Sequence, residues 1–133
     1  MREAAEGWLR DYFADWVRAL DLTIEEIGPE GVVMSMPISD AIRRSGGIAS
    51  GQALAALADT AMVFACAGHF GAFVPVATTT LDTRFLRPAS GARLRCEATV
   101  IRAGKAIVFA EARLLDLPSG KAVAQASATF FKP

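Results

Sequence analysis

The sequence contains few of the residues on which metal and redox sites depend. Its 133 residues include one histidine, His69, and two cysteines, Cys66 and Cys96, and no Cys-x-x-Cys pair occurs. A structural zinc ion is usually held by four Cys or His ligands, so we expect no metal site. We predict that both cysteines are ordinary buried thiols, which suits a reducing, cytoplasmic location. His69 stands near the expected end of a helix, where a polar side chain favours the helix dipole, and we interpret it as structural.

The chain also lacks an excess of charge and an unbroken membrane-length apolar run. It has 14 basic and 14 acidic side chains, whereas nucleic-acid-binding proteins usually carry a basic excess. The first residues, MREAAEGWLRDYF, are charged and amphipathic, so we expect no signal peptide. The longest apolar run, Ala53 to Ala67, is interrupted by Asp59 and is short for a membrane span. We therefore predict neither a nucleic-acid partner nor a membrane partner.

The most informative stretch is an apolar helix in the middle of the chain. Hydrophobic residues make up 53% of the sequence, which suits one domain with a packed core. From Ser50 onward the residues are mostly Ala, Leu and Met, which favour a helix. Ser50 is suited to cap its start, and Gly68 and Gly71 to end it. Because nearly every face of this helix is apolar, we expect the rest of the domain to enclose it.

Asp59 is the one acidic residue in this helix. Burying a carboxylate is costly unless it is paired, hydrogen-bonded or placed at a working site. One interpretation is structural, with Asp59 capping a loop or pairing with an arginine. The other is functional, with Asp59 acting as a nucleophile or general base whose pKa is set by partial burial.

Residues 1–20 are predicted to form a separate N-terminal element. From residue 3 to residue 20, apolar side chains recur at three- and four-residue spacing, the pattern of one amphipathic helix. The apolar face contains several aromatic residues, and we expect it to dock onto the domain or onto a partner subunit. Its members are Trp8, Leu9, Phe13, Trp16, Val17 and Leu20.

The remaining chain, residues 21–133, is predicted to add six strands to the central helix in a single domain. Two strands precede the helix and four follow it, separated by hairpin-type turns. An antiparallel sheet of this kind must wrap the buried helix, which gives an α+β fold. The expected strands are Leu22–Ile27, Val32–Ile38, Val76–Leu86, Arg93–Arg102, Ala106–Leu117 and Lys121–Phe131.

Three segments give the chain a family resemblance. They are Leu57-Ala58-Asp59-Thr60-Ala61-Met62, Phe85-Leu86-Arg87-Pro88-Ala89 and the closing strand, Ala122 to Phe131. Together with the order of elements, they resemble the hotdog-fold thioesterases of the PaaI-like branch, over about residues 20–132. The resemblance implies acyl-CoA thioester hydrolysis without a separate cofactor, since coenzyme A is part of the substrate. It also implies homodimers formed by edge-to-edge sheet pairing, often assembled further as a dimer of dimers.

The family motif assigns roles to individual positions. It makes Asp59 the nucleophile or general base and Gly51 the residue whose backbone amide polarises the thioester carbonyl. An earlier family glycine falls on Gly47, and a hydroxyl residue that positions water falls near Thr78. We further expect Thr60 to help orient the water or the carboxylate.

Three positions depart from the family motif. Arg44 stands where Asn is usual, Ser50 where His is usual and Gln52 where a second Gly is usual. All three would lie beside the substrate, with Ser50 serving as the helix cap. These departures favour a non-catalytic acyl-CoA-binding protein, whereas the retained Asp59 and Gly51 favour an enzyme.

The spacing of Gly51 and Asp59 constrains the site. The two residues are eight positions apart on one helix, about 12 Å along its axis at 1.5 Å per residue. One thioester cannot touch both within a single protomer. If both residues act, the site must be shared between two chains of a dimer.

Basic side chains near strand ends are candidates for binding the phosphates of coenzyme A. We expect Arg87, followed by Pro88, to contribute together with Arg102 and Lys105, although each cation can equally be an ordinary solvated charge. The acyl group would lie among apolar residues whose sizes suit an aryl or medium-chain group. The residues proposed for this pocket are Ala55, Met62, Val63, Phe70 and Phe73.

The sequence thus supports three hypotheses. The leading one is an acyl-CoA thioesterase acting on aryl or medium-chain substrates. The second is a hotdog protein that binds acyl-CoA without hydrolysing it. The third, based only on the amphipathic N-terminal segment, is a structural subunit of a larger complex.

Overall fold

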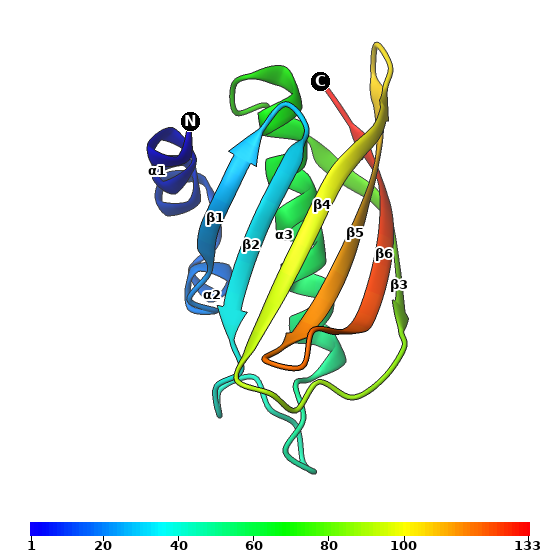
Figure 1. Ribbon diagram of the computed structural model, residues 1–133. Helices are drawn as coiled ribbons and strands as arrows, with labels where there is room; N and C mark the ends of the chain where they lie inside the picture. The colour runs from blue at the N-terminus through cyan, green and yellow to red at the C-terminus, as the bar shows by residue number, and fades with distance from the viewer.

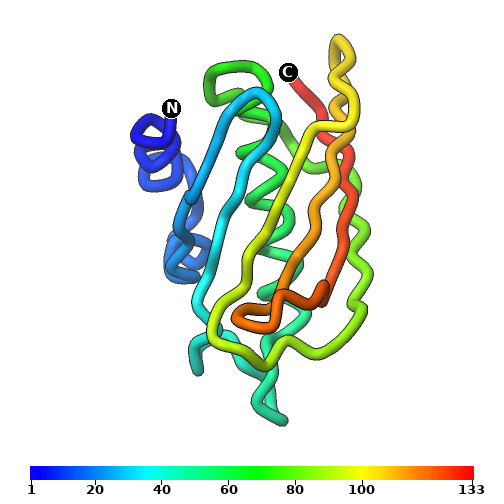
Figure 2. The backbone as a smooth tube through the Cα atoms, viewed as in Figure 1, coloured from blue at the N-terminus to red at the C-terminus, as the bar shows by residue number.

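The computed structural model describes all residues from 1 to 133 and contains three helices and six strands (Figure 1). The tube in Figure 2 follows the chain from the first hairpin through the loop of residues 38–50 and back into the long helix. The helices are α1 (Arg2–Tyr12), α2 (Asp15–Arg18) and α3 (Gly51–Phe70). The strands are β1 (Thr23–Gly28), β2 (Gly31–Pro37), β3 (Ala77–Phe85), β4 (Arg93–Ala103), β5 (Ile107–Leu117) and β6 (Lys121–Phe131).

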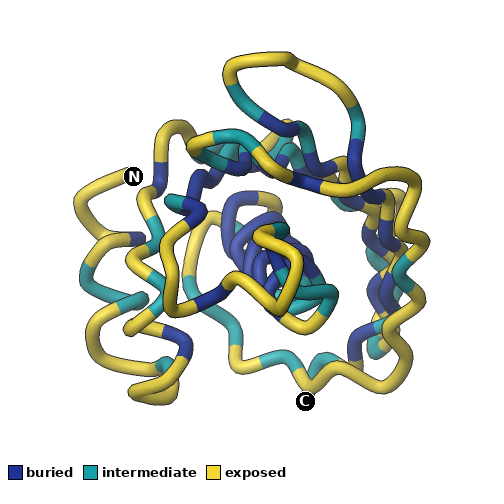
Figure 3. Tube along the Cα trace, turned by 90° about the horizontal axis from the view of Figure 1, so that it is seen from below, coloured by how far each residue is buried: buried dark blue, intermediate teal, exposed yellow.

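The six strands form one antiparallel sheet in the order β1-β2-β4-β5-β6-β3. The sheet curves around α3, which lies in its concave side (Figure 3). The predicted α+β architecture, an antiparallel sheet wrapped around a long helix, is confirmed. This order leaves β1 and β3 as the two edges of the sheet.

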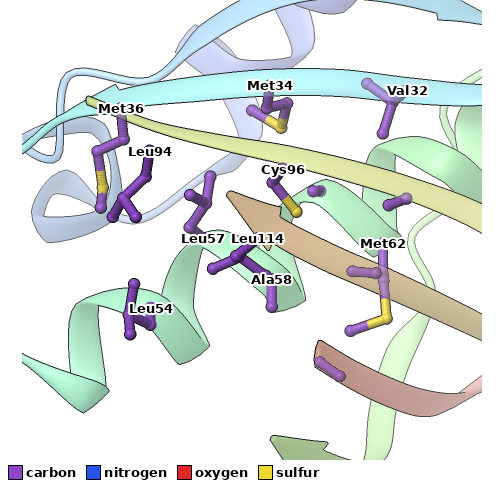
Figure 4. Close-up of a cluster of buried hydrophobic side chains, with 14 of the residues drawn as sticks. Val32, Met34, Met36, Leu54, Leu57, Ala58, Met62, Leu94, Cys96 and Leu114 are labelled. Carbon is purple, nitrogen blue, oxygen red and sulfur yellow. The ribbon is translucent and has the colours of Figure 1, made fainter. Parts of the chain in front are cut away.

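The core forms between α3 and the inner face of the sheet. Leu54, Leu57 and Met62 of the helix meet side chains from β2, β4 and β5 (Figure 4). By length and apolarity, α3 would be able to cross a membrane, but most of it is buried inside the fold. Its apolarity is therefore explained by its place in the core. The sheet residues of this cluster in Figure 4 are Val32, Met34, Met36, Leu94, Cys96 and Leu114.

Both ends of α3 show capping chemistry that the sequence predicts. Ser50 Oγ accepts a hydrogen bond from the amide of Ala53 at 3.2 Å, as an N-cap does. At the other end Gly71 adopts the left-handed conformation, with φ +75°, and its amide donates to the carbonyl of Ala67.

The prediction that Gly68 ends the helix is wrong, because this residue lies inside α3. A side chain at position 68 would overlap the backbone carbonyl of Gly28 at the β1–β2 turn. Gly68 therefore allows the close packing of helix against hairpin, and the helix continues to Phe70.

The predicted N-terminal helix is confirmed, but its expected extent to residue 20 is wrong, because the segment breaks into α1 and α2 at Phe13 and Ala14. Both residues have extended backbone angles, with ψ near 150°. The break turns Phe13 inward, where its ring stacks on Phe64 of α3 with 5.2 Å between the ring centroids. The aromatic face thus docks onto its own domain, except for Trp16, which is 63% exposed.

Candidate active site

Asp59 of α3 and Thr78 of β3 form a direct side-chain pair. The hydroxyl of Thr78 donates to the Asp59 carboxylate, with 2.9 Å between the oxygens. Asp59 is half-buried and forms no ion pair with any arginine or lysine. The structure therefore joins two of the predicted catalytic residues and gives no arginine partner to the carboxylate.

Burial changes the acidity of this carboxyl group. Desolvation raises the pKa of Asp59 above its ordinary value of 3.8, and the hydrogen bond from Thr78 acts in the opposite direction. A raised pKa makes the carboxylate a stronger proton acceptor than an exposed aspartate. This property suits a general base.

Asp59 lies on the only stripe of α3 that the fold leaves partly open along the middle of the helix. Ala55, Ala56 and Val63 are also half-buried and share this face at three- and four-residue spacing. The stripe runs beside β3. Asp59 is hydrogen-bonded to Thr78 near the start of this strand, and Gly51 lies next to the ring of Phe85 at its end. Asp59 thus faces the free edge of the sheet.

The N-terminus of α3 presents two backbone amides without partners. The amide of Ala53 is bonded to Ser50 Oγ, and the amide of Leu54 donates to the carbonyl of Ser50. The amides of Gly51 and Gln52 precede the first intrahelical bond and remain free. Free amides at the positive end of a helix dipole stabilise negative charge, such as a developing oxyanion.

A cavity of about 360 Å³ lies at the start of α3, with Gly51 in its wall. Its walls come from the loop before α3, from the start of α3 and from the segment that follows β3. Arg44 and Arg87 stand on its two sides, and both are exposed. The lining residues are Arg44, Ile48, Ala49, Gly51, Leu54, Phe85, Leu86, Arg87, Pro88 and Ala89.

The loop that carries Arg44 makes a tight turn before the helix. Gly46 and Gly47 have φ of +98° and +79°, a conformation that favours glycine, and the amide of Gly47 donates to the carbonyl of Arg44. This turn places Arg44 at the cavity, where its guanidinium donates to the carbonyl of Ser45 at 2.9 Å. Gly47 therefore shapes the loop, whereas Gln52 is exposed on the first turn of α3.

Several predicted site residues do not join this group within one protomer. Thr60 is buried, and its hydroxyl donates to the carbonyl of Ala56 in its own helix, so that proton is not directed to Asp59. Arg102 and Lys105 are exposed at the β4–β5 turn, at the end of the sheet opposite the N-terminus of α3 (Figure 1).

Two of the residues expected in an acyl pocket belong to other clusters. Met62 is fully buried in the core. Phe73 stacks on Tyr12 with 4.7 Å between ring centroids and also contacts Trp8 and Phe13. These residues support the fold and the N-terminal arm, and the expectation that they line the pocket is wrong.

The cavity includes residues that sequence reasoning did not assign to a site. Ile48 and Ala49 come from the loop before α3, and Leu86 and Ala89 from the segment after β3. Leu86 and Ala89 belong to the segment Phe85–Ala89, which carries part of the family resemblance, so the sequence contains a signal for them. Ile48 and Ala49 carry no motif, and only the three-dimensional arrangement identifies them.

The match to a family model decides the identity of the chain. The model for the thioesterase superfamily matches residues 46–133, which include α3, β3, β4, β5 and β6. The chain belongs to the thioesterase superfamily. A search of curated proteins gave no significant match.

Solved structures of other thioesterase-superfamily proteins share the fold. One X-ray structure of a protein from this superfamily has a TM-score of 0.88 and 29% identity, covering 99% of this chain and 98% of that one. The PaaI protein from the phenylacetic acid degradation operon of E. coli has a TM-score of 0.85 and 20% identity, covering 98% and 91%. A thioesterase from Haemophilus influenzae has a TM-score of 0.87 and 19% identity, covering 98% and 89%. The superfamily member described here therefore has the hotdog fold.

Proposed function

We propose that this protein is an acyl-CoA thioesterase that hydrolyses aryl or medium-chain substrates at a site shared by two protomers. The observation that carries the proposal is the Asp59–Thr78 pair, which faces the free edge of β3. The free amides of Gly51 and Gln52, the cavity that Gly51 lines and membership of the thioesterase superfamily support it.

The proposed dimer forms through β3. All residues of this strand are exposed except the half-buried Thr83, and one side of its backbone has no partner strand. Leu81 and Phe85 point to the helix side of the sheet, as their register with Ala128 and Ala124 indicates, yet they are 38% and 54% exposed. A second copy that adds its own β3 would cover them.

Two further features of β3 favour another copy of the same chain as the partner. The hydroxyl of Thr83 is buried without a hydrogen-bond partner, an arrangement that is costly unless a further group contacts it. Asp82 and Arg84 lie on the opposite face and form no ion pairs within the protomer. In an antiparallel pair of identical strands, Asp82 of one copy approaches Arg84 of the other, so the edge is complementary to itself.

The two-fold symmetry of such a pair would also complete the site. It reverses the direction of the second α3, and the N-terminus of each helix then lies beside the middle of the other. Gly51 of one protomer would thereby approach Asp59 of its partner, although the two are about 12 Å apart along the axis of one helix. The same reversal would bring Arg102 and Lys105 toward the cavity of the other copy.

The proposed chemistry uses groups that these residues already hold in place. The amides of Gly51 and Gln52 bind the thioester oxygen as it becomes negative. Asp59 removes a proton from a water molecule whose oxygen bonds to the carbonyl carbon. The carbon–sulfur bond then breaks, and the sulfur leaves as the thiol of coenzyme A after taking up a proton. Direct attack by Asp59, followed by hydrolysis of the resulting anhydride, is the covalent version of the same scheme.

The substrate class follows from charge and size around the same groups. Arg44 and Arg87 at the cavity suit the phosphates of coenzyme A. Beside Asp59 the small side chains of Ala55 and Ala56 leave space along the open stripe of α3, which suits an aryl or medium-chain acyl group. Association of two dimers and a cytoplasmic location stay predictions.

The experiment that tests this function is thiol release from a panel of acyl-CoAs by wild type and Asp59→Ala. The panel contains aryl and aliphatic chains, each also supplied as the N-acetylcysteamine thioester, which lacks the phosphates of coenzyme A. We expect turnover by wild type, a preference for the CoA form and loss of turnover in the variant. A dimeric wild type that binds acyl-CoA without hydrolysing it would instead be a non-catalytic binding protein.

A further inference from the structure

A second carboxylate, Asp116, is held in place near the end of β5. This residue is 8% exposed, and it forms no ion pair with any basic residue. One of its oxygens accepts a hydrogen bond from the backbone amide of Gly91, with 3.0 Å between nitrogen and oxygen. A buried carboxylate is retained only with such partners, and this partner belongs to the loop between β3 and β4.

The loop fits against Asp116 so closely that only glycine suits position 91. A Cβ atom there would overlap both the Asp116 carboxylate and the carbonyl oxygen of Leu117. The amide of the next residue, Ala92, donates to that carbonyl at 2.8 Å, and the carbonyl of Ala92 accepts from Ile38 at 2.9 Å. The end of this loop is thus fixed to β5 and to the chain that follows β2.

The other half of the same loop forms a wall of the cavity. Leu86, Arg87, Pro88 and Ala89 line it opposite the start of α3. The carbonyl of Ala89 accepts a hydrogen bond from the amide of Ala49 at 3.0 Å, directly before the Ser50 cap. A continuous set of contacts therefore leads from Asp116 through the loop to the free amides at the N-terminus of α3.

We propose that Asp116 is a positioning residue for acyl-CoA binding. The amides of Leu86 and Arg87 donate to the carbonyl of Val123 and hold one end of the wall of residues 86–89. By holding the amide of Gly91, Asp116 fixes the other end relative to the N-terminus of α3. The inference rests on the proposed function, because it concerns the cavity to which that function assigns the substrate. Asp116 is not among the residues that line the cavity and forms no hydrogen bond with Asp59, so its removal should weaken binding and leave the chemical step nearly unchanged.

The test compares Asp116→Ala, which removes the acceptor, with Asp116→Asn, which keeps an oxygen acceptor of the same reach. Glu111→Ala is the matched control, because Glu111 is an exposed carboxylate on the same strand without an ion pair. Three quantities are measured: the Kd for a thioether analogue of phenylacetyl-CoA, the KM and kcat for acyl-CoA, and amide hydrogen exchange of residues 86–92.

For Asp116→Ala we expect Kd and KM to rise by about tenfold, with kcat within about threefold of wild type and faster exchange in the loop. Asp116→Asn and Glu111→Ala should match wild type. A normal Kd in Asp116→Ala, or the same loss in Asp116→Asn, would overturn the inference. If Asp116→Ala does not fold, amide hydrogen exchange of Gly91 in the wild-type protein still tests the inference. Rapid exchange of this amide would overturn it, because an amide held by Asp116 must exchange slowly.

The outcomes also separate this inference from the proposed function. A wild type that neither binds the analogue nor releases thiol would overturn the function. The exchange rates of residues 86–92 in wild type and in the variants would still show whether Asp116 holds the loop.

Discussion

The hydroxyl of Thr78 donates a 2.9 Å hydrogen bond to Asp59 and so connects the edge strand β3 to the one acidic residue of α3. Any chain that pairs with the free edge of β3 therefore arrives next to this carboxylate. The arrangement explains how a polar residue on an otherwise apolar helix is tolerated, because Asp59 lies on the open stripe and not in the core.

The acid side of the pH–rate profile should respond to Thr78→Val. Burial raises the pKa of Asp59 and the Thr78 hydrogen bond lowers it, so removal of the hydroxyl should raise this pKa further. A general base works when deprotonated, hence kcat/KM falls as the pH drops through that pKa. In Thr78→Val the fall should begin at a higher pH, and kcat/KM at mildly acidic pH should drop several-fold.

Thr79→Val is the control for this change, because the hydroxyl of Thr79 donates to the carbonyl of Thr129 and not to Asp59. Its acid limb should coincide with that of wild type. An unmoved acid limb in Thr78→Val, or one displaced to lower pH, would contradict the role of Asp59 as the base.

Replacement of Gly51 by proline should remove one oxyanion donor without breaking α3. Proline is favoured at the first position of a helix, and Ser50 already has the extended backbone, with ψ 148°, that a residue before proline requires. We expect kcat of Gly51→Pro to fall by about 10²- to 10³-fold.

The matched variant is Gly51→Ala, which keeps the amide and brings a Cβ to the same ring of Phe85, at 3.3 Å. It should retain most of the wild-type kcat, since the Phe85 ring has to move by only a few tenths of an ångström. Equal losses in the alanine and proline variants would assign the effect to crowding instead of to the missing amide.

Charge reversal on β3 should control dimerisation. Asp82→Arg places like charges near each other across the proposed interface, and we expect it to shift the dimer toward monomer and to lower activity in parallel. The double variant with Arg84→Asp restores opposite charges and should recover both properties. Sedimentation velocity measures the fraction of dimer in each variant, and thiol release measures its activity. If the single and double variants are as dimeric as wild type, the interface lies elsewhere.

Much of the fold could be predicted because the local patterns agree with the packing. The strand Lys121–Phe131 has the predicted bounds, and Ser50 caps the helix as expected. The N-terminal break at Phe13 was missed because the contact of its ring with Phe64 is distant in sequence. Gly68 was misread for the same reason, since its small size serves contact with Gly28 and not a helix end.

The site could be predicted only in part. The family resemblance predicted Asp59, Thr78 and Gly51 as site residues; the structure pairs the first two, and the role of each stays a prediction. Apolar periodicity shows that Met62 and Phe73 are packed but not in which cluster, so their assignment to a pocket was wrong. Asp116 has no sequence signal, because its partner is a backbone amide in a distant loop.

A heterodimer of Asp59→Asn and Gly51→Pro protomers tests the shared site most directly. The two chains are coexpressed with different tags, purified through both, and assayed for thiol release. If each site takes Asp59 from one protomer and Gly51 from the other, one of the two sites in this heterodimer is intact. It should then show about half of the wild-type activity, although each parent homodimer is inactive. A heterodimer as inactive as its parents would show that Asp59 and Gly51 do not complement each other across the interface, and it would contradict the account.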